Sequence, residues 1–381
     1  MMKVKYKIAE CIYGVGNMIL RSAEVLLFKR PSDSPTKILL FRTGHLGDTV
    51  CAIPALRLIS EKYPDARFYL LTSEKEDGLP HPVEVLKGII SFEEHFTFVP
   101  PGTDRMKVPE GLAGRLRKEH FDLLVYLGQY PAGVGRMLRD MVFFKMAGVR
   151  SVMGFKWCKH RIFRLAQRQN GIFDDEVTRL VKLVNDQAAA PGEIRWGMPS
   201  VPIDDIAEVD PGERLIAVHT DAKFPVNLWP LSKFKRLIEE LNEELHPSAI
   251  VIVGGNPGSD RSNLLQTVKG GNIIDLRGRT GFLGLAEVLR RCKLLITTDS
   301  GPAHVAAAVG IPVVGIYSAR DYPNCWHPHG DRHIIIRKEI DCQICMRERC
   351  DSMACIKQIT VAEVLHAVGN VMEIEDAERR I

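Results

Sequence analysis

One stretch constrains the fold more than any other: residues 294–318, with the sequence LLITTDSGPAHVAAAVGIPVVGIYS. Its apolar start predicts a buried strand, and the change to Ser300-Gly301-Pro302 predicts the start of a helix. Ser300 is a suitable N-cap, Gly301 permits close backbone approach, and Pro302 suits the first turn. A helix of small residues over 303–309 and a second strand over 311–316 would complete a β-α-β unit.

The start of this helix is a candidate site for a phosphate. Free backbone N–H groups and the helix dipole converge there, and the dipole favours an anion by about 0.3–1 kcal/mol per charge. Asp299 and His304 lie on either side of Ser300 and Gly301 in the sequence, and we expect His304 to face the bound group. An ordinary strand–helix turn with a capping serine would show the same pattern, so both interpretations stay open on these residues alone.

The totals indicate a two-domain globular protein. A length of 381 residues fits two domains, and 45% hydrophobic with 26% charged residues is typical of soluble proteins. The net charge of +4 is too small to indicate nucleic-acid binding. We find no uncharged run near the roughly 20 residues that span a bilayer, and no cleavable signal. Nine cysteines, an odd number, predict mostly reduced thiols in a cytosolic protein.

The first half predicts a doubly wound parallel sheet. A strand over 37–41, a loop over 42–48 and a helix over 49–62 come first, and further strands are expected at 67–72, 89–99 and 123–127. The loop contains Gly44, His45 and Gly47, and Asp48 stands at the helix start. Ligands of such sheets gather at the carboxyl ends of strands, where Asp48 is placed.

The second half repeats this architecture after a linker over 193–211. The expected order is a strand over 215–219, a polar loop over 220–230, a helix from Ser232 to about 244, strands over 249–253 and 273–276, and a helix over 283–292. Gly254 and Gly255 follow the second of these strands. They would let the backbone approach a nucleotide, although forming a turn is the commoner use of such a pair.

Residues 3–30 form a basic, amphipathic lead-in. The predicted helix could lie in a membrane interface, or it could pack on the surface of its own domain. Residues 31–35 read as a linker.

A second basic stretch, 141–173, contains no acidic residue. Its basic residues are interleaved with Phe143, Phe144, Phe155, Trp157 and Phe163. We interpret it as a docking surface for an anionic partner, with the aromatic rings for apolar or sugar contact. A solvated basic surface, or a helix whose aromatic residues belong to the core, is the alternative. No nucleic-acid recognition module lies beside it.

Four cysteines cluster near the end of the chain, at Cys342, Cys345, Cys350 and Cys355. Thiolates at this spacing could hold a structural zinc ion or an iron–sulfur cluster. Zinc ribbons, however, usually separate their CxxC pairs more widely. Local disulfides, or free thiols that pin a loop, are the alternatives.

Several of these segments together resemble one known family. They are KILLFRTGHLGDTVCAIPAL from Lys37, the loop ending NLWP, the Gly254-Gly255 strand end, the run from Asp275 to Ser318, and CIKQITVAEVL near the end. They resemble the family 9 glycosyltransferases, the ADP-heptose:lipopolysaccharide heptosyltransferases, from about Lys37 to Val368. The first loop with its aspartate and the TDSGPAH string are specific as a pair, whereas either alone would be weak.

The resemblance implies an α/β protein with the GT-B fold, in which two Rossmann-like domains face each other across a cleft. We expect an N-terminal extension over 1–35, an acceptor-binding domain over 36–195, a nucleotide-sugar-binding domain over 212–360 and a C-terminal helix over 361–381. The reaction implied is an inverting, metal-independent sugar transfer that requires no cofactor.

The resemblance also implies roles for individual residues. Asp48 matches the general base. The expected donor-binding residues are Thr220, Lys223, Asn227, Gly254, Gly255, Asp260, Asp299, Ser300, Gly301 and His304. The expected acceptor-binding residues are Gly44, His45, Gly47, Arg136, Lys156, Lys159, Arg161 and Arg164. The family commonly has a lysine near the donor phosphates where this chain has Asn227, and Lys223 could substitute for it.

The expected partners are a nucleotide-diphosphate-sugar, ADP-heptose above all, and an anionic lipid-linked or oligosaccharide acceptor such as a lipopolysaccharide core. No nucleic-acid partner is expected. The expected location is the cytoplasm, with peripheral contact at the inner face of the membrane. Two other functions stay open: a nucleotide-sugar epimerase of the same fold, and a non-catalytic protein that binds nucleotide-sugar or glycan.

Overall fold

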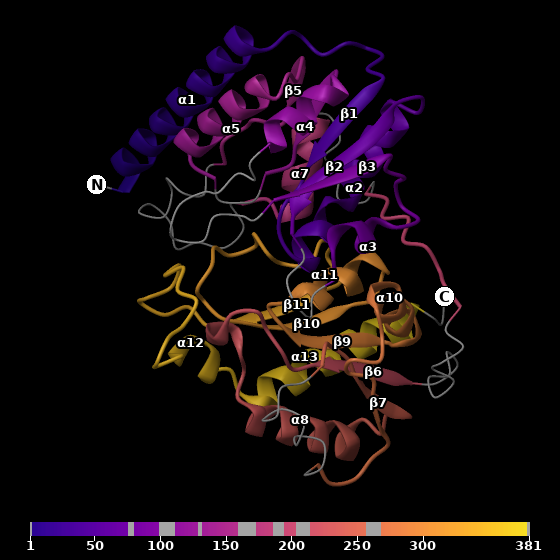
Figure 1. The fold of residues 1–381 in the computed structure, drawn as a ribbon. Helices are drawn as coiled ribbons and strands as arrows, with labels where there is room; N and C mark the ends of the chain where they lie inside the picture. Colours follow the sequence, from indigo (N-terminus) through magenta and orange to yellow (C-terminus); the bar gives the residue numbers. More distant parts are fainter. Residues whose placement is uncertain are drawn as a thin grey trace. The chain divides into compact units, whose positions relative to one another are not determined.

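The computed structural model describes residues 2–74, 80–98, 111–128, 132–158, 173–185, 194–202, 214–256 and 268–378. The chain divides into two compact units, the first formed by Met1–Asp77 and His81–Arg195 and the second centred on Trp196–Ile381. Each unit contains a parallel sheet with helices packed on it (Figure 1). In the described part of the chain, no helix combines the length and apolar character needed to cross a membrane.

The first unit has a five-stranded sheet in the order β3-β2-β1-β4-β5. Its strands are β1 (Lys37–Phe41), β2 (Arg67–Ser73), β3 (Glu94–Phe98), β4 (Leu123–Tyr126) and β5 (Ser151–Met153). All pairings are parallel, and Leu39 of β1 lies between Tyr69 and Leu124. The central strand is buried on both faces, as its continuous run of Ile and Leu predicts.

The helices of this unit are α1 (Met2–Leu27), α2 (Leu46–Lys62), α3 (Pro82–Leu86), α4 (Leu112–Glu119), α5 (Val134–Met146) and α7 (Glu176–Val184). Two predicted boundaries were wrong. Helix α2 starts at Leu46 rather than 49, because the loop turns as early as Gly44 at a φ of 122°. Strand β3 is shorter than the predicted 89–99, because α3 and its closing turn occupy the preceding residues.

The aromatic residues of the stretch 141–173 belong mainly to the core of this unit. Phe155 stacks on Tyr126 with ring centroids 4.0 Å apart, and Phe41 packs against both Tyr126 and Phe144. Phe144 and Phe155 are buried. The interpretation of these two rings as sugar contacts was therefore wrong, since the core already surrounds them. Phe163 and the basic residues from Lys159 to Arg168 lie outside the described residues.

The second unit has a six-stranded parallel sheet in the order β11-β10-β9-β6-β7-β8. Its strands are β6 (Leu215–His219), β7 (Ala249–Ile252), β8 (Ile273–Asp275), β9 (Leu294–Thr298), β10 (Val313–Tyr317) and β11 (Ile334–Arg337). The edge strand β11 was not predicted. Its residues are only half-buried, and no helix pattern precedes it in the sequence.

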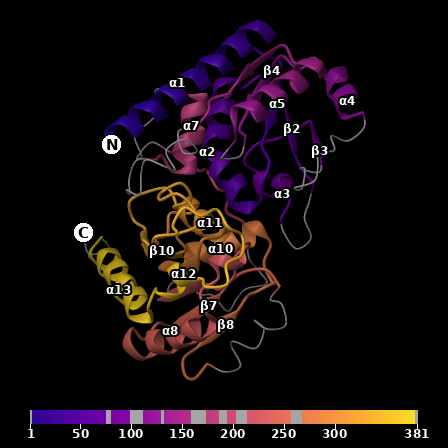
Figure 2. The same cartoon turned by 90° about the vertical axis from the view of Figure 1, so that its left-hand side faces the viewer.

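The helices of the second unit are α8 (Leu231–Glu244), α10 (Phe282–Arg291), α11 (Gly301–Ala308), α12 (Ala354–Lys357) and α13 (Val361–Glu378), with a 3₁₀ turn, η2 (Pro225–Asn227). Figure 2 gives a second view of both sheets. The predicted cap of α8 was wrong. The helix starts at Leu231 with Pro230 in the N-cap position, so Ser232 lies inside its first turn.

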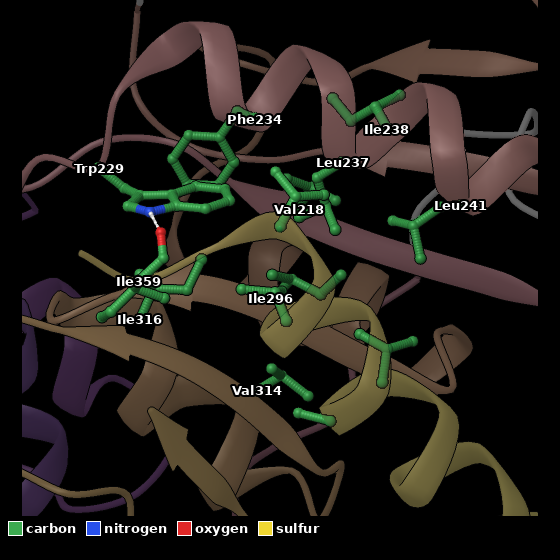
Figure 3. Packing of buried hydrophobic residues seen from close by; sticks show 14 of the residues in the cluster. Val218, Trp229, Phe234, Leu237, Ile238, Leu241, Ile296, Val314, Ile316 and Ile359 are labelled. Atoms are coloured by element: carbon green, nitrogen blue, oxygen red, sulfur yellow. Dashed lines mark hydrogen bonds between the residues drawn. The ribbon is translucent and has the colours of Figure 1, made fainter. Parts of the chain in front are cut away.

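Trp229 joins three segments of this unit (Figure 3). Its indole is fully buried and packs edge-on against Phe234 of α8, with ring centroids 4.9 Å apart. Its Nε1–H donates a hydrogen bond of 3.1 Å to the carbonyl of Ile359, just before α13. Trp229 therefore holds the loop over 220–230 against α8 and the C-terminal helix.

Replacing Trp229 with Ala should lower the free energy of unfolding by about 3–5 kcal/mol, because it opens a large cavity in the core. Trp229→Phe should cost clearly less, since it keeps the ring contact with Phe234. Urea denaturation of the two variants measures the difference. An alanine variant whose unfolding free energy lies within about 1 kcal/mol of the wild-type value would contradict this role, because substitutions in a core usually cost more than this.

Candidate active site

The first cluster of polar side chains lies at the carboxyl edge of the first sheet. The chain builds β2 and β3 on one side of β1 and then β4 and β5 on the other, so the topological switch point lies between β1 and β4. Ligands of open parallel sheets bind outside the carboxyl ends of strands at this point. The loop from Arg42 to His45 and the start of α2 occupy it.

Asp48 is the third residue of α2, and its carboxylate is fixed by the loop. Oδ2 accepts a hydrogen bond of 2.9 Å from the backbone N–H of His45. Oδ1 lies 3.7 Å from Nη2 of Arg42, and the side chain is 15% exposed. Asp48 is thus an oriented carboxylate that solvent, and hence a substrate hydroxyl, can reach.

A buried ionic group lies directly behind Asp48. The guanidinium of Arg42 is fully buried, and its Nε donates a hydrogen bond of 2.9 Å to the backbone carbonyl of Asp48. Its Nη1 donates one hydrogen bond to the carbonyl of Leu127 and another, of 3.2 Å, to the carboxylate of Glu176. Arg179 binds the same carboxylate through two hydrogen bonds of 2.6 and 2.8 Å. Sequence reasoning missed these three residues, because nothing in their local pattern shows that α7 packs on α2.

Glu176 stays ionised despite its burial. Burial alone raises the pKa of Glu176, but the guanidinium groups of Arg179 and Arg42 outweigh it and hold the pKa below its ordinary value. Arg42 is therefore locked by an ionised partner, and it fixes the backbone of the turn that carries Asp48.

The second cluster lies at the corresponding edge of the second sheet, where β6 and β9 meet at the switch point. His219 ends β6, and its Nδ1 lies 3.1 Å from Oγ1 of Thr297 and 3.2 Å from Oγ of Ser300. The two hydroxyls are 3.0 Å apart. Ser300 occupies the N-cap position of α11 as predicted, but its side chain makes no capping bond, because it binds Thr297, Thr298 and His219 instead.

Asp299 lies beside this cluster and is held by an amide. The side-chain amide of Asn227 donates a hydrogen bond of 3.0 Å to Oδ2 of Asp299, and its carbonyl oxygen accepts one of 2.6 Å from the hydroxyl of Ser318. Burial, with a smaller contribution from Asp321, raises the pKa of Asp299 to about 7, against the opposing effect of Arg320. A neutral amide is a suitable partner for a carboxyl group that is protonated much of the time near neutral pH.

The other predicted donor residues surround this edge. Thr220 is buried directly after β6, and Lys223 is exposed with Nζ 5.3 Å from the Phe224 ring centroid. Gly254 follows β7 at a φ of 143°, and a Cβ there would lie 3.1 Å from the His219 ring. His304 is 3% exposed and lies edge-on to Trp326. Gly255 is exposed beside Gly254, and Gly301 starts α11. Asp260 lies outside the described residues.

The predicted acceptor residues divide into two groups. Gly44, His45 and Gly47 lie in the turn that carries Asp48. Arg136 is exposed in the first turn of α5, which begins shortly after the carboxyl end of β4 and so at the same edge of the sheet. Lys156 is exposed after β5. Lys159, Arg161 and Arg164 lie outside the described residues.

The four clustered cysteines are free thiols. In the described ranges, no group of His, Cys, Asp or Glu is arranged to hold a metal ion. Backbone hydrogen bonds hold the loop instead. The N–H of Ile344 donates a hydrogen bond of 2.7 Å to the carbonyl of Ala319, and the N–H of Met346 donates one of 2.9 Å to the carbonyl of Arg320. The thiolate cage that the spacing allows is not formed here, since Cys355 packs into the hydrophobic core while Cys342 is exposed.

Glu176→Gln should lower the free energy of unfolding by about 3–5 kcal/mol, because it removes the buried carboxylate that the guanidinium groups of Arg42 and Arg179 share. Glu61→Gln, on the exposed part of α2, is the matched control and should change it by less than about 0.5 kcal/mol. Urea denaturation measures both. Equal, small effects would show that the buried group is not ionised as described.

Asp299 should make stability depend on pH. A carboxyl group whose pKa is raised on folding contributes stability that is fully present when the pH is below the pKa of the group in the unfolded chain. This contribution is lost as the pH rises towards and through 7, the pKa of Asp299 in the folded protein. The unfolding free energy of wild type should therefore fall relative to Asp299→Asn between about pH 5 and 8, on the order of 2 kcal/mol. Asp351→Asn, at an exposed position, is the control. Parallel profiles for wild type and Asp299→Asn would contradict the raised pKa.

Comparison with known proteins agrees with the two-sheet architecture. The sequence model of glycosyltransferase family 9 (heptosyltransferase) matches residues 142–356, more than half of the chain. The chain is 23% identical to lipopolysaccharide heptosyltransferase 3 of Escherichia coli K12 over 312 residues, covering 74% of this chain and 82% of the relative. It is 21% identical to lipooligosaccharide heptosyltransferase 2 of Campylobacter jejuni over 347 residues, covering 88% and 98%.

Solved structures show the same fold. A family 9 glycosyltransferase from Veillonella parvula superposes with a TM-score of 0.64 at 16% identity, over 90% of this chain and 99% of that one. The ADP-heptose lipopolysaccharide heptosyltransferase II of Escherichia coli superposes with a TM-score of 0.60 at 18% identity, over 90% and 100%. The chain therefore belongs to glycosyltransferase family 9 and is a glycosyltransferase with the GT-B fold.

Proposed function

We propose that this protein is an inverting heptosyltransferase that moves a heptose from ADP-heptose to a lipopolysaccharide-core-like glycan. The names of its relatives in Escherichia coli and Campylobacter jejuni support the sugar and the acceptor class. The name of the superposed Escherichia coli structure supports the nucleotide. The observation that carries the mechanism is the oriented, partly exposed carboxylate of Asp48 at the switch point of the first sheet.

In the proposed step, an acceptor hydroxyl attacks the anomeric carbon of the donor sugar. The new C–O bond forms as the bond to the diphosphate breaks, the electron pair leaves with ADP, and Asp48 takes the hydroxyl proton. Inversion needs a base on the face opposite the leaving group, and a carboxylate suits this task. The His45 N–H orients the carboxylate, and Arg42 holds its turn in place.

The donor diphosphate is proposed to bind at the start of α11. The backbone N–H groups of Gly301 and its neighbours, with the hydroxyl of Ser300, would stabilise the charge that develops on the leaving phosphate. Asp299 limits electrostatic repulsion there, because its raised pKa keeps it protonated much of the time near neutral pH. We propose that Asn227 replaces the usual lysine without loss because it needs to bind only this neutral acid, while the exposed Lys223 supplies positive charge.

The acceptor is proposed to bind in the first unit. Gly44, His45 and Gly47 would contact the attacking sugar beside Asp48, and the exposed Arg136 and Lys156 would bind its anionic groups. The same role is proposed for Lys159, Arg161 and Arg164. The free thiols support a reducing compartment, so we propose the cytoplasm as the location.

The direct test supplies ADP-heptose and a heptose-deficient lipopolysaccharide acceptor, and measures ADP release together with the mass of the glycan product. Asp48→Asn should lower turnover by about 10²- to 10⁴-fold, because the amide cannot take the proton. Binding of ADP, measured by calorimetry, should stay the same, and Asp65→Asn at an exposed position of the same unit should retain activity.

Turnover by Asp48→Asn at the wild-type rate would remove Asp48 as the base. Transfer from another nucleotide-sugar, but not from ADP-heptose, would overturn the proposed donor. A wild-type protein that binds ADP and transfers no sugar at all would overturn the proposed function.

A further inference from the structure

The exposed large hydrophobic side chains of this protein gather on two neighbouring helices. In the part of the chain that the structure describes, all of them belong to α1 or α5, and they are 43–83% exposed. They are Ile8, Ile12, Val15, Met18, Ile19, Val25, Leu26, Val142 and Met146. Single exposed apolar residues are ordinary, but a group of this size on two packed helices marks an interaction surface.

The packing of α1 fixes which of its faces is exposed. Its inner face carries Gly16, where a Cβ would lie 2.4 Å from the ring of Trp157, and Leu20, which is fully buried against the core of the first unit. Figures 1 and 2 show α1 lying along α5 on the outside of this unit. The exposed apolar residues recur every three or four positions from Ile8 to Ile19, and Val25 and Leu26 follow one heptad after Met18 and Ile19, so they form one stripe along the helix.

The same two helices, together with the three residues that follow α1, are basic. Residues 2–30 and 134–146 contain nine of the 51 basic residues of the chain but only three of its 47 acidic residues, so the rest of the chain is slightly acidic. Several of these basic side chains are exposed beside the stripe: Lys7, Arg21, Lys29, Arg30 and Lys145. The surface thus combines an apolar stripe with basic flanks.

We infer that this surface binds an anionic membrane, with α1 lying flat in the interface. Its apolar stripe would enter the boundary between headgroups and acyl chains, and the basic flanks would bind lipid phosphates. A second copy of the chain fits less well, because a symmetric dimer through this surface would bring two basic surfaces together. The inference goes beyond the proposed transfer reaction and stands without it.

The test is flotation of the full-length protein with vesicles of phosphatidylcholine, alone or mixed with phosphatidylglycerol. Wild type should float with the mixed vesicles, float much less with phosphatidylcholine alone, and detach as salt rises, since exposed charge contacts are screened. The double variant Ile12→Asp, Val15→Asp should bind the mixed vesicles about tenfold or more weakly, because charge now replaces apolar residues in the stripe.

Lys357→Glu is the matched control. It changes the net charge by the same amount at an exposed position of α12, in the second unit, which carries no part of this surface, and it should leave vesicle binding within about twofold of wild type. Because both altered side chains in the double variant are exposed, its thermal unfolding should match that of wild type.

Wild type that fails to float with the mixed vesicles would overturn the inference, as would a double variant that binds them as wild type does. A wild-type dimer that the double variant converts to monomer, without vesicle binding in either, would assign the surface to a second copy instead. Loss of transferase activity in every assay would leave the vesicle result unaffected, so the two proposals fail separately.

Discussion

Burial of both faces of each parallel sheet is the constraint on which the rest of this structure depends. Strands such as β1 and β10 are apolar along almost their whole length because helices cover them on two sides. Polar groups can then gather only where strands end. The carboxyl ends at the two switch points collect Asp48 with its buried arginine in one unit, and His219, Thr297 and Ser300 in the other.

The two units stabilise their buried carboxyl groups in opposite ways. Glu176 keeps its charge because two guanidinium groups surround it, and this holds the turn of Asp48 in a fixed geometry. Asp299 has an amide partner in Asn227, and its pKa rises to about 7. The difference follows from the charges beside each group: two guanidinium groups contact Glu176, whereas Asp299 is buried beside a neutral amide and near the carboxyl group of Asp321.

Local chemistry in the sequence was enough to predict the inner strands of both sheets and the position of the Asp299–His304 segment, but neither of the edge strands β5 and β11. Gly44 marks a turn that needs a positive φ, Ser300-Gly301-Pro302 marks the start of a helix, and the apolar runs mark central strands. The partners of the site residues could not be predicted in this way. Arg42 and Glu176 are 134 positions apart in the sequence and meet only because their helices and strands pack together. No local sequence pattern indicates such a pair. The edge strand β11, half-buried and without a helix before it, gave no distinct signal either.

Helix α1 shows how far a periodic pattern reaches. The sequence predicts an amphipathic helix, yet it leaves open whether the apolar side faces the protein or a membrane, because both environments favour the same residues. Packing shows that the face with Gly16 and Leu20 contacts the protein and that the apolar side chains on the other face are exposed. Helix α1 already buries one face against the protein, so the exposed hydrophobic residues on its other face are not needed to hold it in place. An exposed apolar patch of this size is typical of a surface that binds a partner.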